Sequence, residues 1–339
     1  MKEFINYRVT QDICHQKWSS FVCNHPKGNI FQTPEMFEVY KGTKKCNPIA
    51  LGVVDYKYDI VGILLAVIQK EHNGIFGIFS SRAIITGGPI VENDNQEILS
   101  LLLSSYNEVI KHRVIYSQIR NIFDTSSSVH QFIKLAYNYE PHLDIINDLS
   151  IDKDLLWNKI SPKARNKIRK AEKNGLEFRV IDSTENISKQ SYNILKDVYT
   201  RAKLPLADKS LFSSTFNILR TKQYIKVFGA FLDDNLIAIR IGLVYKDMIY
   251  DWYAGTYTKY IKCNANDFLP YYILIWGAEN GYKTFDFGGA GKPNVPYGVR
   301  DHKLKFGGTL VEYGRFIRVN NKFIYWVGKT AIQLRKKLL

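Results

Sequence analysis

Charged residues and glycines that could take part in chemistry concentrate in residues 281–308, GYKTFDFGGAGKPNVPYGVRDHKLKFGG. A short apolar strand carries Asp286 and ends in a cluster of glycines, which let a backbone approach a ligand closely. Closely spaced basic residues follow: Arg300, His302, Lys303 and Lys305. A strand that ends in such a loop is a common place for a functional site. The stretch therefore predicts that Asp286 and Lys303 handle charge in a reaction; a structural loop with solvated lysines is the alternative.

The glycine-rich loop does not match the phosphate-binding P-loop, G-x-x-x-x-G-K-[ST]. That pattern needs glycine where Asp286 stands, and serine or threonine where Pro293 stands. The sequence therefore excludes a P-loop at this position.

A second stretch, residues 161–175, predicts a strongly basic helix with the sequence SPKARNKIRKAEKNG. Ser161 can cap it, Pro162 suits its first position and Gly175 can end it. Arg165 and Arg169 stand four residues apart, hence on one face. Because arginine offers paired donors to phosphate oxygens, the helix predicts phosphate binding. A solvated charged face is the alternative.

The elements around these stretches occur twice in the same order: hairpin, strand, helix, strand. The first set is predicted at residues 49–69, 74–80, 94–110 and 114–119. The second set is predicted at residues 227–245, 248–254, 266–280 and 283–287. This repetition predicts an internal duplication of an α/β (α+β) domain with a mixed, mostly antiparallel sheet flanked by helices. We expect one domain at residues 1–150 and another at 151–339, with the basic linker helix at 161–175 and a terminal helix at 321–339.

Composition indicates the class of partner. The 339-residue chain has a formal charge of +15 at pH 7, which favours nucleic acid, nucleotide-linked substrates or an anionic membrane surface. Aromatic residues make up 14% of the chain, which suits sheet-rich cores and sites that stack on flat ligands. The four cysteines lack C-x-x-C spacing, so neither a zinc site nor a disulfide framework is predicted.

Both stretches resemble the Fem family of non-ribosomal peptidyltransferases. YKTFDFGGA, followed by G-V-x-x-H-K-x-K-F-G-G, resembles its carboxy-terminal signature. The block S-x-K-x-R-N-x-I-R-K-A-E-K-x-G resembles a second family motif nearly residue for residue. With the tandem plan, the resemblance covers residues 30–320. It implies two tandem domains of the acetyltransferase (GNAT) type, without the helical-hairpin insertion that some members carry.

The resemblance implies an acyltransferase that moves an amino acid from aminoacyl-tRNA to an amine of a peptidoglycan or other cell-envelope precursor. The precursor is nucleotide- or lipid-linked, and no metal or redox cofactor is used. Lys303 matches the family lysine and would stabilise the oxyanion formed when the amine attacks the ester. Asp286 would orient that amine or anchor the loop. The expected substrate-binding residues are Lys41, Arg165, Asn166, Arg169, Tyr253, His302 and Lys305.

Two of these residues carry a qualification. His302 stands where the family pattern has phenylalanine. Tyr253 either contacts the acceptor or packs in the core.

Two other functions remain open. An N-acyltransferase that uses acyl-CoA and acts on an amino sugar of a surface polysaccharide would need a pyrophosphate loop, [QR]-x-x-G-x-[GA]. Residues 257–265, YTKYIKCNA, contain no glycine, which disfavours CoA. The third candidate is a binding protein for RNA or a nucleotide sugar without catalytic activity.

The sequence predicts a cytoplasmic, reduced and soluble protein. Its opening residues are too polar for a signal peptide. Its longest aliphatic run, residues 60–68, is shorter than the ~20 apolar residues that a membrane span needs. The predicted terminal helix combines aromatic and basic residues. It either packs on the second domain or lies on the inner face of an anionic membrane.

Overall fold

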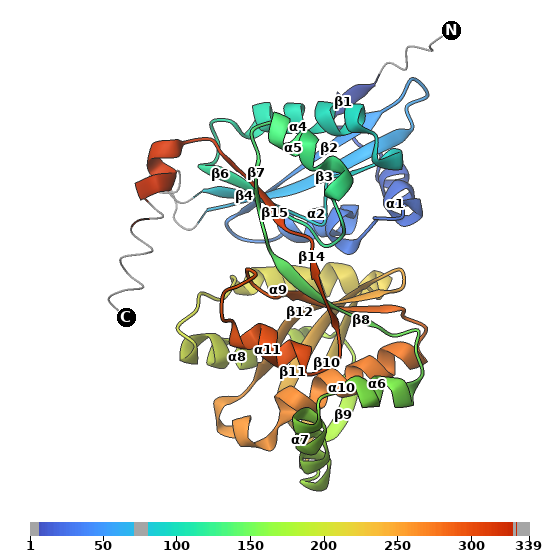
Figure 1. Ribbon diagram of the computed structural model, residues 1–339, viewed down its shortest axis with the longest axis vertical. Coiled ribbons are helices and arrows are strands. Elements are labelled where there is room, and N and C mark those ends of the chain that lie inside the picture. Colours follow the sequence, from blue (N-terminus) through green and yellow to red (C-terminus); the bar gives the residue numbers. More distant parts are fainter. Residues whose placement is uncertain (1–6, 71–80, 328–329, 331–339) are drawn as a thin grey trace. The chain divides into compact units, whose positions relative to one another are not determined.

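The computed structural model describes residues 7–70, 81–327 and 330. The chain forms two units, each built on one sheet (Figure 1). The first unit comprises residues 1–141 and 313–339, and the second comprises residues 142–312. Helices flank both sheets, as the sequence predicts.

The sheet of the first unit has the strand order β1-β2-β3-β4-β6-β15-β7, and β5 pairs with β3. Its strands are β1 (Arg8–Thr10), β2 (Cys46–Val54), β3 (Ile60–Gln69), β4 (Arg82–Thr86), β5 (Ile90–Val91), β6 (Tyr116–Arg120), β7 (Asn138–Glu140) and β15 (Arg315–Val319). Its helices are α1 (His15–Asn24), α2 (Pro34–Lys41), α4 (Gln96–Ile110) and α5 (Val129–Lys134). The aliphatic run at residues 60–68 lies in β3 and is buried, so it belongs to the sheet core.

The sheet of the second unit has the strand order β14-β8-β13-β12-β11-β10-β9. Its strands are β8 (Leu143–Asp148), β9 (Glu177–Ile181), β10 (Ile225–Leu232), β11 (Asn235–Tyr245), β12 (Met248–Thr256), β13 (Thr284–Gly289) and β14 (Thr309–Glu312). Its helices are α6 (Lys153–Lys159), α7 (Pro162–Lys173), α8 (Glu185–Arg201), α9 (Lys209–Leu219), α10 (Ala265–Glu279) and α11 (Gly298–Leu304). The core forms where α7 and α10 pack together and α10 lies on the sheet.

The predicted duplication is visible in how the strands connect. Each sheet contains one parallel pair joined through a helix: β4 and β6 through α4, and β12 and β13 through α10. An antiparallel hairpin lies beside each pair, formed by β2 and β3 or by β10 and β11. The strand predicted at residues 74–80 lies outside the described residues, and β4 is the strand that precedes α4 in the first sheet.

The predicted domain boundary near residue 150 differs from the observed division, which falls after Pro141. Strand β8 belongs to the second sheet because it pairs with both β13 and β14. Strand β15 returns to the first sheet, where it lies between β6 and β7. The predicted second domain of 151–339 is therefore corrected at both ends. Pairing between strands far apart in sequence decides the boundary, and local sequence patterns do not report such pairing.

The predicted terminal helix lies partly outside the described residues. Residues 322–327 are helical, and the ring of Tyr325 packs on Tyr116 of β6 with centroids 5.3 Å apart. This contact belongs to the first unit, so the predicted packing on the second domain is not what the structure shows. The side chains of Phe323 and Trp326 are 75% and 64% exposed. Across the part of the chain that the structure describes, no helix is both long and apolar enough to cross a membrane.

We expect the glycines that close the 281–308 stretch to be required for stability. Gly307 has φ +76°, and an added Cβ would lie 2.5 Å from Cβ of Lys159 and 2.9 Å from the Lys159 carbonyl oxygen. Gly307→Ala should lose about 1 kcal/mol from the left-handed backbone and about 1–3 kcal/mol more from the clash. Gly281→Ala is the control, because Gly281 has φ +78° with open space around it. Thermal unfolding of both variants tests this; equal losses would contradict it.

Candidate active site

The second sheet opens between β12 and β13. Their parallel pairing ends at Tyr250 and Asp286, although β12 continues to Thr256 and β13 to Gly289. Just beyond the last pair, Trp252 forms a β-bulge on β12, as an extra residue opposite the Ile241–Gly242 step of β11. Bulges re-aim side chains and are frequent beside active sites. The carboxyl end of β13 thus lacks β12 as a neighbour.

Lys303 of α11 occupies this opening. Its Nζ donates hydrogen bonds to the carbonyl oxygens of Phe287 at 2.6 Å and Gly289 at 3.0 Å, with Gly288 O at a longer 3.4 Å. Burial lowers the pKa of the Lys303 ammonium, and the carboxylate of Asp251 acts in the opposite direction. The lysine therefore holds the end of β13 while it remains a partly buried cation.

Two charged side chains that the sequence did not single out lie close to Lys303. Nε of Arg240 on β11 is 3.4 Å from Oδ1 of Asp251 on β12, and the two side chains are only 11% and 7% exposed. The Arg240 guanidinium also lies 5.6 Å from the centroid of the Phe287 ring. Nη1 of Arg240 and Oδ1 of Asp251 are buried without a hydrogen-bond partner among the described residues. Buried unpartnered polar atoms are uncommon and frequently mark functional sites.

Burial also shifts the pKa of Asp251. It raises the pKa of this carboxyl, while Arg240 and Lys303 oppose the shift. A carboxylate with a raised pKa is a stronger base than an ordinary one, which suits it to accept a proton in a reaction.

Asp286 on β13 is fully buried. Its Oδ1 accepts a hydrogen bond from the Gly288 amide at 2.6 Å, and Oδ2 has no partner among the described residues. This contact fixes the turn at Gly288, whose φ of +68° favours glycine. Burial raises the pKa of Asp286 to about 7. The loop-anchoring role is thus observed, and the predicted role in orienting an amine stays a prediction.

His302 and Lys305 flank Lys303, and the two make different contacts. The His302 ring meets Phe306 edge-on, with centroids 5.5 Å apart, and its Nε2 is 3.3 Å from the carbonyl oxygen of Asn266. Burial lowers the pKa of this imidazole. Lys305 ends α11, and its carbonyl oxygen accepts a hydrogen bond from the Ser161 amide at 2.8 Å. His302 therefore packs against Phe306, and Lys305 links α11 to the start of the basic helix.

The basic helix forms as predicted, over Pro162–Lys173, with Ser161 as its N-cap and Gly175 at φ +79°. Ala164, Ile168 and Ala171 form its buried face.

The basic side chains of this helix take different positions. The Arg165 and Arg169 guanidinium carbons lie 5.9 and 5.2 Å from the centroid of the Trp157 ring. Asn166 is exposed. Lys167 pairs with the buried Asp267 of α10 at 3.0 Å. The arginines thus gather at Trp157, and phosphate binding there stays a prediction.

The two remaining predicted residues lie on separate elements. Tyr253 of β12 is partly buried among aromatic rings, with centroids 4.7 Å from Trp252 and 4.9 Å from Phe212 of α9. These contacts show packing, and contact with an acceptor stays a prediction. Lys41 ends α2 in the first unit, where its side chain is 65% exposed and lies 3.5 Å from Glu38. Its predicted role in substrate binding also stays a prediction.

Arg240 and Asp251 carry a signal that was visible in the sequence. Each is a single charge inside an apolar strand, in LIAIRIGLVY and MIYDWYAG. A buried charge within a strand must be paired or functional. Their meeting depends on the register across β11 and β12 and on the bulge at Trp252, which composition does not reveal.

The described residues contain no group of three or more His, Cys, Asp or Glu side chains that could hold a metal ion.

Comparison with protein-family models matches residues 159–303 to the acetyltransferase (GNAT) domain. A search of curated proteins finds no match. The crystal structure of FemX is similar with a TM-score of 0.74 and 16% sequence identity, over 94% of this chain and 99% of that chain.

Two further solved structures are similar over nearly the whole chain. The C-terminal domain of a putative lysylphosphatidylglycerol synthetase from Agrobacterium fabrum gives a TM-score of 0.61 and 12% identity, over 94% of this chain and 96% of that chain. A tandem GNAT protein from the clavulanic acid biosynthesis pathway gives 0.59 and 9% identity, over 93% and 99%. The comparisons confirm the predicted Fem-like tandem GNAT fold and support an acyltransferase.

The raised pKa of Asp286 predicts a pH-dependent stability. Its pKa is raised from 3.8 to about 7, so the folded carboxyl stays protonated where the unfolded one ionises. The contribution of Asp286 to the unfolding free energy should therefore fall from about pH 4 to about pH 7, by at most about 1.4 kcal/mol per pH unit, and then level off. Asp286→Asn lacks this proton, so its unfolding free energy relative to wild type should rise over the same range.

Urea unfolding at several pH values measures this difference. Asp247→Asn is the control, because Asp247 is half exposed and pairs with Lys283 at the surface. A difference between Asp286→Asn and wild type that does not change with pH would show that Asp286 is already ionised in the folded protein.

Proposed function

We propose that this Fem-like tandem GNAT protein transfers an amino acid from aminoacyl-tRNA to an amine of a peptidoglycan or other cell-envelope precursor. One observation carries the proposal: Lys303, the residue that matches the family lysine, lies at the opening between β12 and β13 beside the buried Arg240 and Asp251. A cation in such a water-poor opening is suited to stabilise an oxyanion. The fold similarity to FemX and to a lysylphosphatidylglycerol synthetase domain supports the same class of reaction.

The hydrogen bonds of Lys303 leave one donor for a substrate. An ammonium has three N–H groups, and two of them bond the carbonyls of Phe287 and Gly289 at 2.6 and 3.0 Å. The third lies near Gly288 O, but the distance from Nζ is 3.4 Å, which is longer than a good hydrogen bond. In the proposed reaction this third N–H turns to the carbonyl oxygen of the aminoacyl ester as the amine attacks and the oxyanion forms.

Asp251 is suited to the proton transfers of this reaction. The attacking amine must lose a proton as its nitrogen bonds to the ester carbon, and the tRNA hydroxyl must gain one as the C–O bond breaks. Burial raises the pKa of Asp251 above its ordinary value, and Nε of Arg240 lies 3.4 Å from its Oδ1. We assign Asp251 the role of taking the proton from the amine and returning it to the leaving hydroxyl.

The start of α10 favours this donor over acyl-CoA. A CoA pyrophosphate would need free amides and no competing negative charge at this helix N-terminus. Here the first turn carries the buried Asp267, paired with Lys167, and residues 257–265 contain no glycine. Acyl-CoA-dependent transfer to an amino sugar of a surface polysaccharide remains the second candidate, because the matched family model describes an acetyltransferase domain.

We place the reaction in the cytoplasm, where charged tRNA is found, without a metal or redox cofactor. The exposed Phe323 and Trp326 offer an apolar surface for contact with the inner face of the membrane. The arginines at Trp157 are the proposed phosphate contacts of the precursor or of the tRNA.

The donor is tested by mass spectrometry. The purified protein is offered a nucleotide-linked muropeptide with either a mixed aminoacyl-tRNA pool or acetyl-CoA. We expect the acceptor to gain the mass of an aminoacyl residue only with tRNA. A gain of an acetyl group only with CoA would replace the proposal by the second candidate. A protein that binds tRNA or the nucleotide sugar yet modifies the acceptor with neither donor would be a binding protein.

We expect Lys303→Ala to lower kcat by about 10²–10³-fold with little change in KM, because it removes a donor to the oxyanion. The measurement is steady-state kinetics with the donor established above. Lys283→Ala is the matched control, because Lys283 lies 70% exposed in the same unit and pairs only with Asp247 among the described residues. Melting temperatures show whether the loss of the carbonyl contacts unfolds the variant. An unchanged kcat in a folded Lys303→Ala protein would remove Lys303 from the reaction.

A further inference from the structure

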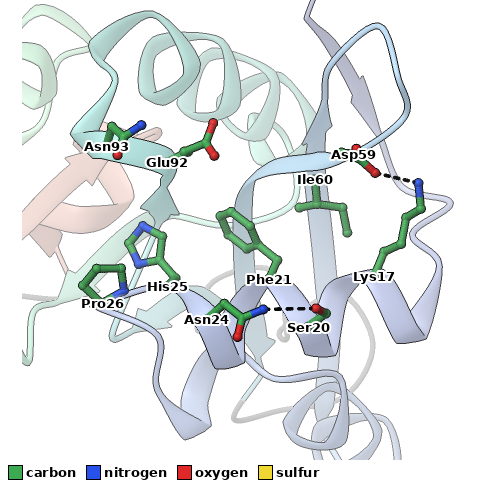
Figure 2. A pocket seen from close by; sticks show the side chains of 10 residues that line it. All are labelled: Lys17, Ser20, Phe21, Asn24, His25, Pro26, Asp59, Ile60, Glu92 and Asn93. Carbon is green, nitrogen blue, oxygen red and sulfur yellow. Dashed lines mark hydrogen bonds and ion pairs between the residues drawn. The ribbon is translucent and has the colours of Figure 1, made fainter.

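The first unit contains a cavity of about 400 Å³ that includes none of the residues assigned to the transfer reaction (Figure 2). It lies between α1, the turn that joins β2 to β3, and the short 3-10 helix Glu92–Asp94. The lining residues are Lys17, Ser20, Phe21, Asn24, His25, Pro26, Asp59, Ile60, Glu92 and Asn93. Its volume is within the range of small-molecule sites.

Polar contacts at both ends of α1 hold the walls of this cavity. Near the start of the helix, Lys17 Nζ donates to the Tyr58 carbonyl and to Asp59 Oδ1, both at 2.9 Å. At its end, Nδ1 of His25 accepts the Lys27 amide at 3.0 Å, so its Nε2 carries the proton and donates to the Val91 carbonyl at 2.9 Å. The cavity is therefore preformed, and His25 is a neutral part of its wall.

The lining leaves several acceptors available to a ligand, beside the donors of Asn93, Asn24 and Ser20. The Glu92 carboxylate has no partner among the described residues. Asn24 donates to Ser20 Oγ at 3.3 Å, which leaves its Oδ1 to accept. Asp59 uses Oδ1 for Lys17 and retains Oδ2. Lys17, by contrast, has used two of its three donors. A complementary ligand must therefore bring donors.

The charge of the lining also favours a ligand that is positively charged and carries hydrogen-bond donors. One cation, Lys17, faces two carboxylates, Asp59 and Glu92, so the cavity has a net charge of −1 within a chain of +15. The ring of Phe21 adds an aromatic face, which attracts cations. Figure 2 shows Glu92 and Phe21 lining the same cavity from two different elements.

We propose that this cavity binds a primary ammonium group carried by a small polar molecule. Glu92 accepts from the ammonium, which lies against the face of Phe21. The remaining N–H of Lys17 and the Ser20 hydroxyl bind an oxygen of the same ligand. An amino acid derivative and an amino sugar both present this chemistry and fit the volume. The site is independent of the transfer reaction, so its test does not depend on the donor or the acceptor.

Isothermal titration calorimetry with the full-length protein tests the proposal. The probes are two pairs that differ only by N-acetylation: D-glucosamine with N-acetyl-D-glucosamine, and L-alaninamide with N-acetyl-L-alaninamide. We expect at least one free amine to bind and its acetylated partner to bind at least tenfold more weakly. Binding of glucosamine alone or of alaninamide alone identifies the ligand class. No binding of either amine at millimolar concentration, or equal binding of the acetylated partner, overturns the proposal.

Variants of the lining provide the second readout. Glu92→Gln should weaken amine binding at least tenfold, because it removes the ion pair and keeps the shape. Phe21→Leu should weaken it roughly two- to fivefold through loss of the cation–π contact. The matched control is Glu97→Gln, an exposed carboxylate on α4 outside the cavity. Equal effects of the two glutamate variants would show that only the overall charge of the surface matters.

Discussion

The separation of β12 from β13 is the constraint on which the candidate active site depends. Backbone carbonyls at a strand end need partners when they are removed from water. Beyond Asp286, the last residue of β13 that pairs with β12, the carbonyl oxygens of Phe287 and Gly289 accept hydrogen bonds from the Lys303 ammonium. The lysine that matches the family pattern thus also supplies the hydrogen bonds that the end of β13 needs. This explains why α11 follows β13 after one short loop, since the helix must return its lysine to the strand that it has just left.

The buried charges around this opening depend on one another. Two cations, Lys303 and Arg240, lie near two carboxyls, Asp251 and Asp286. Burial moves the pKa of the two acids up and that of Lys303 down, so these three groups are pushed toward their neutral forms. The opposite charges limit these shifts. Shifts in these directions bring the proton affinities of the acids and of the lysine closer together, which suits the proposed transfer of a proton from an amine to a hydroxyl.

Local signals in the sequence predicted much of the fold. Features that depend on contacts between distant segments could not be predicted from such signals. Ser161, Pro162 and Gly175 set the ends of the basic helix through their own backbone preferences, and the structure confirms them. The repeated order of hairpin, strand, helix and strand reflects short-range periodicity and also holds. Strand β15 and the boundary after Pro141 depend on pairing between distant segments. The Arg240–Asp251 pair depends on a bulge, so the sequence showed both residues without showing that they meet.

The basic helix illustrates how one element can serve both stability and binding. Its buried face packs in the core, and Lys167 forms an ion pair with Asp267. Arg165 and Arg169 instead share the ring of Trp157. Contact with an aromatic ring leaves the N–H groups at the edge of a guanidinium available, and these are the groups that bind phosphate oxygens. Packing on Trp157 is therefore compatible with the proposed phosphate binding.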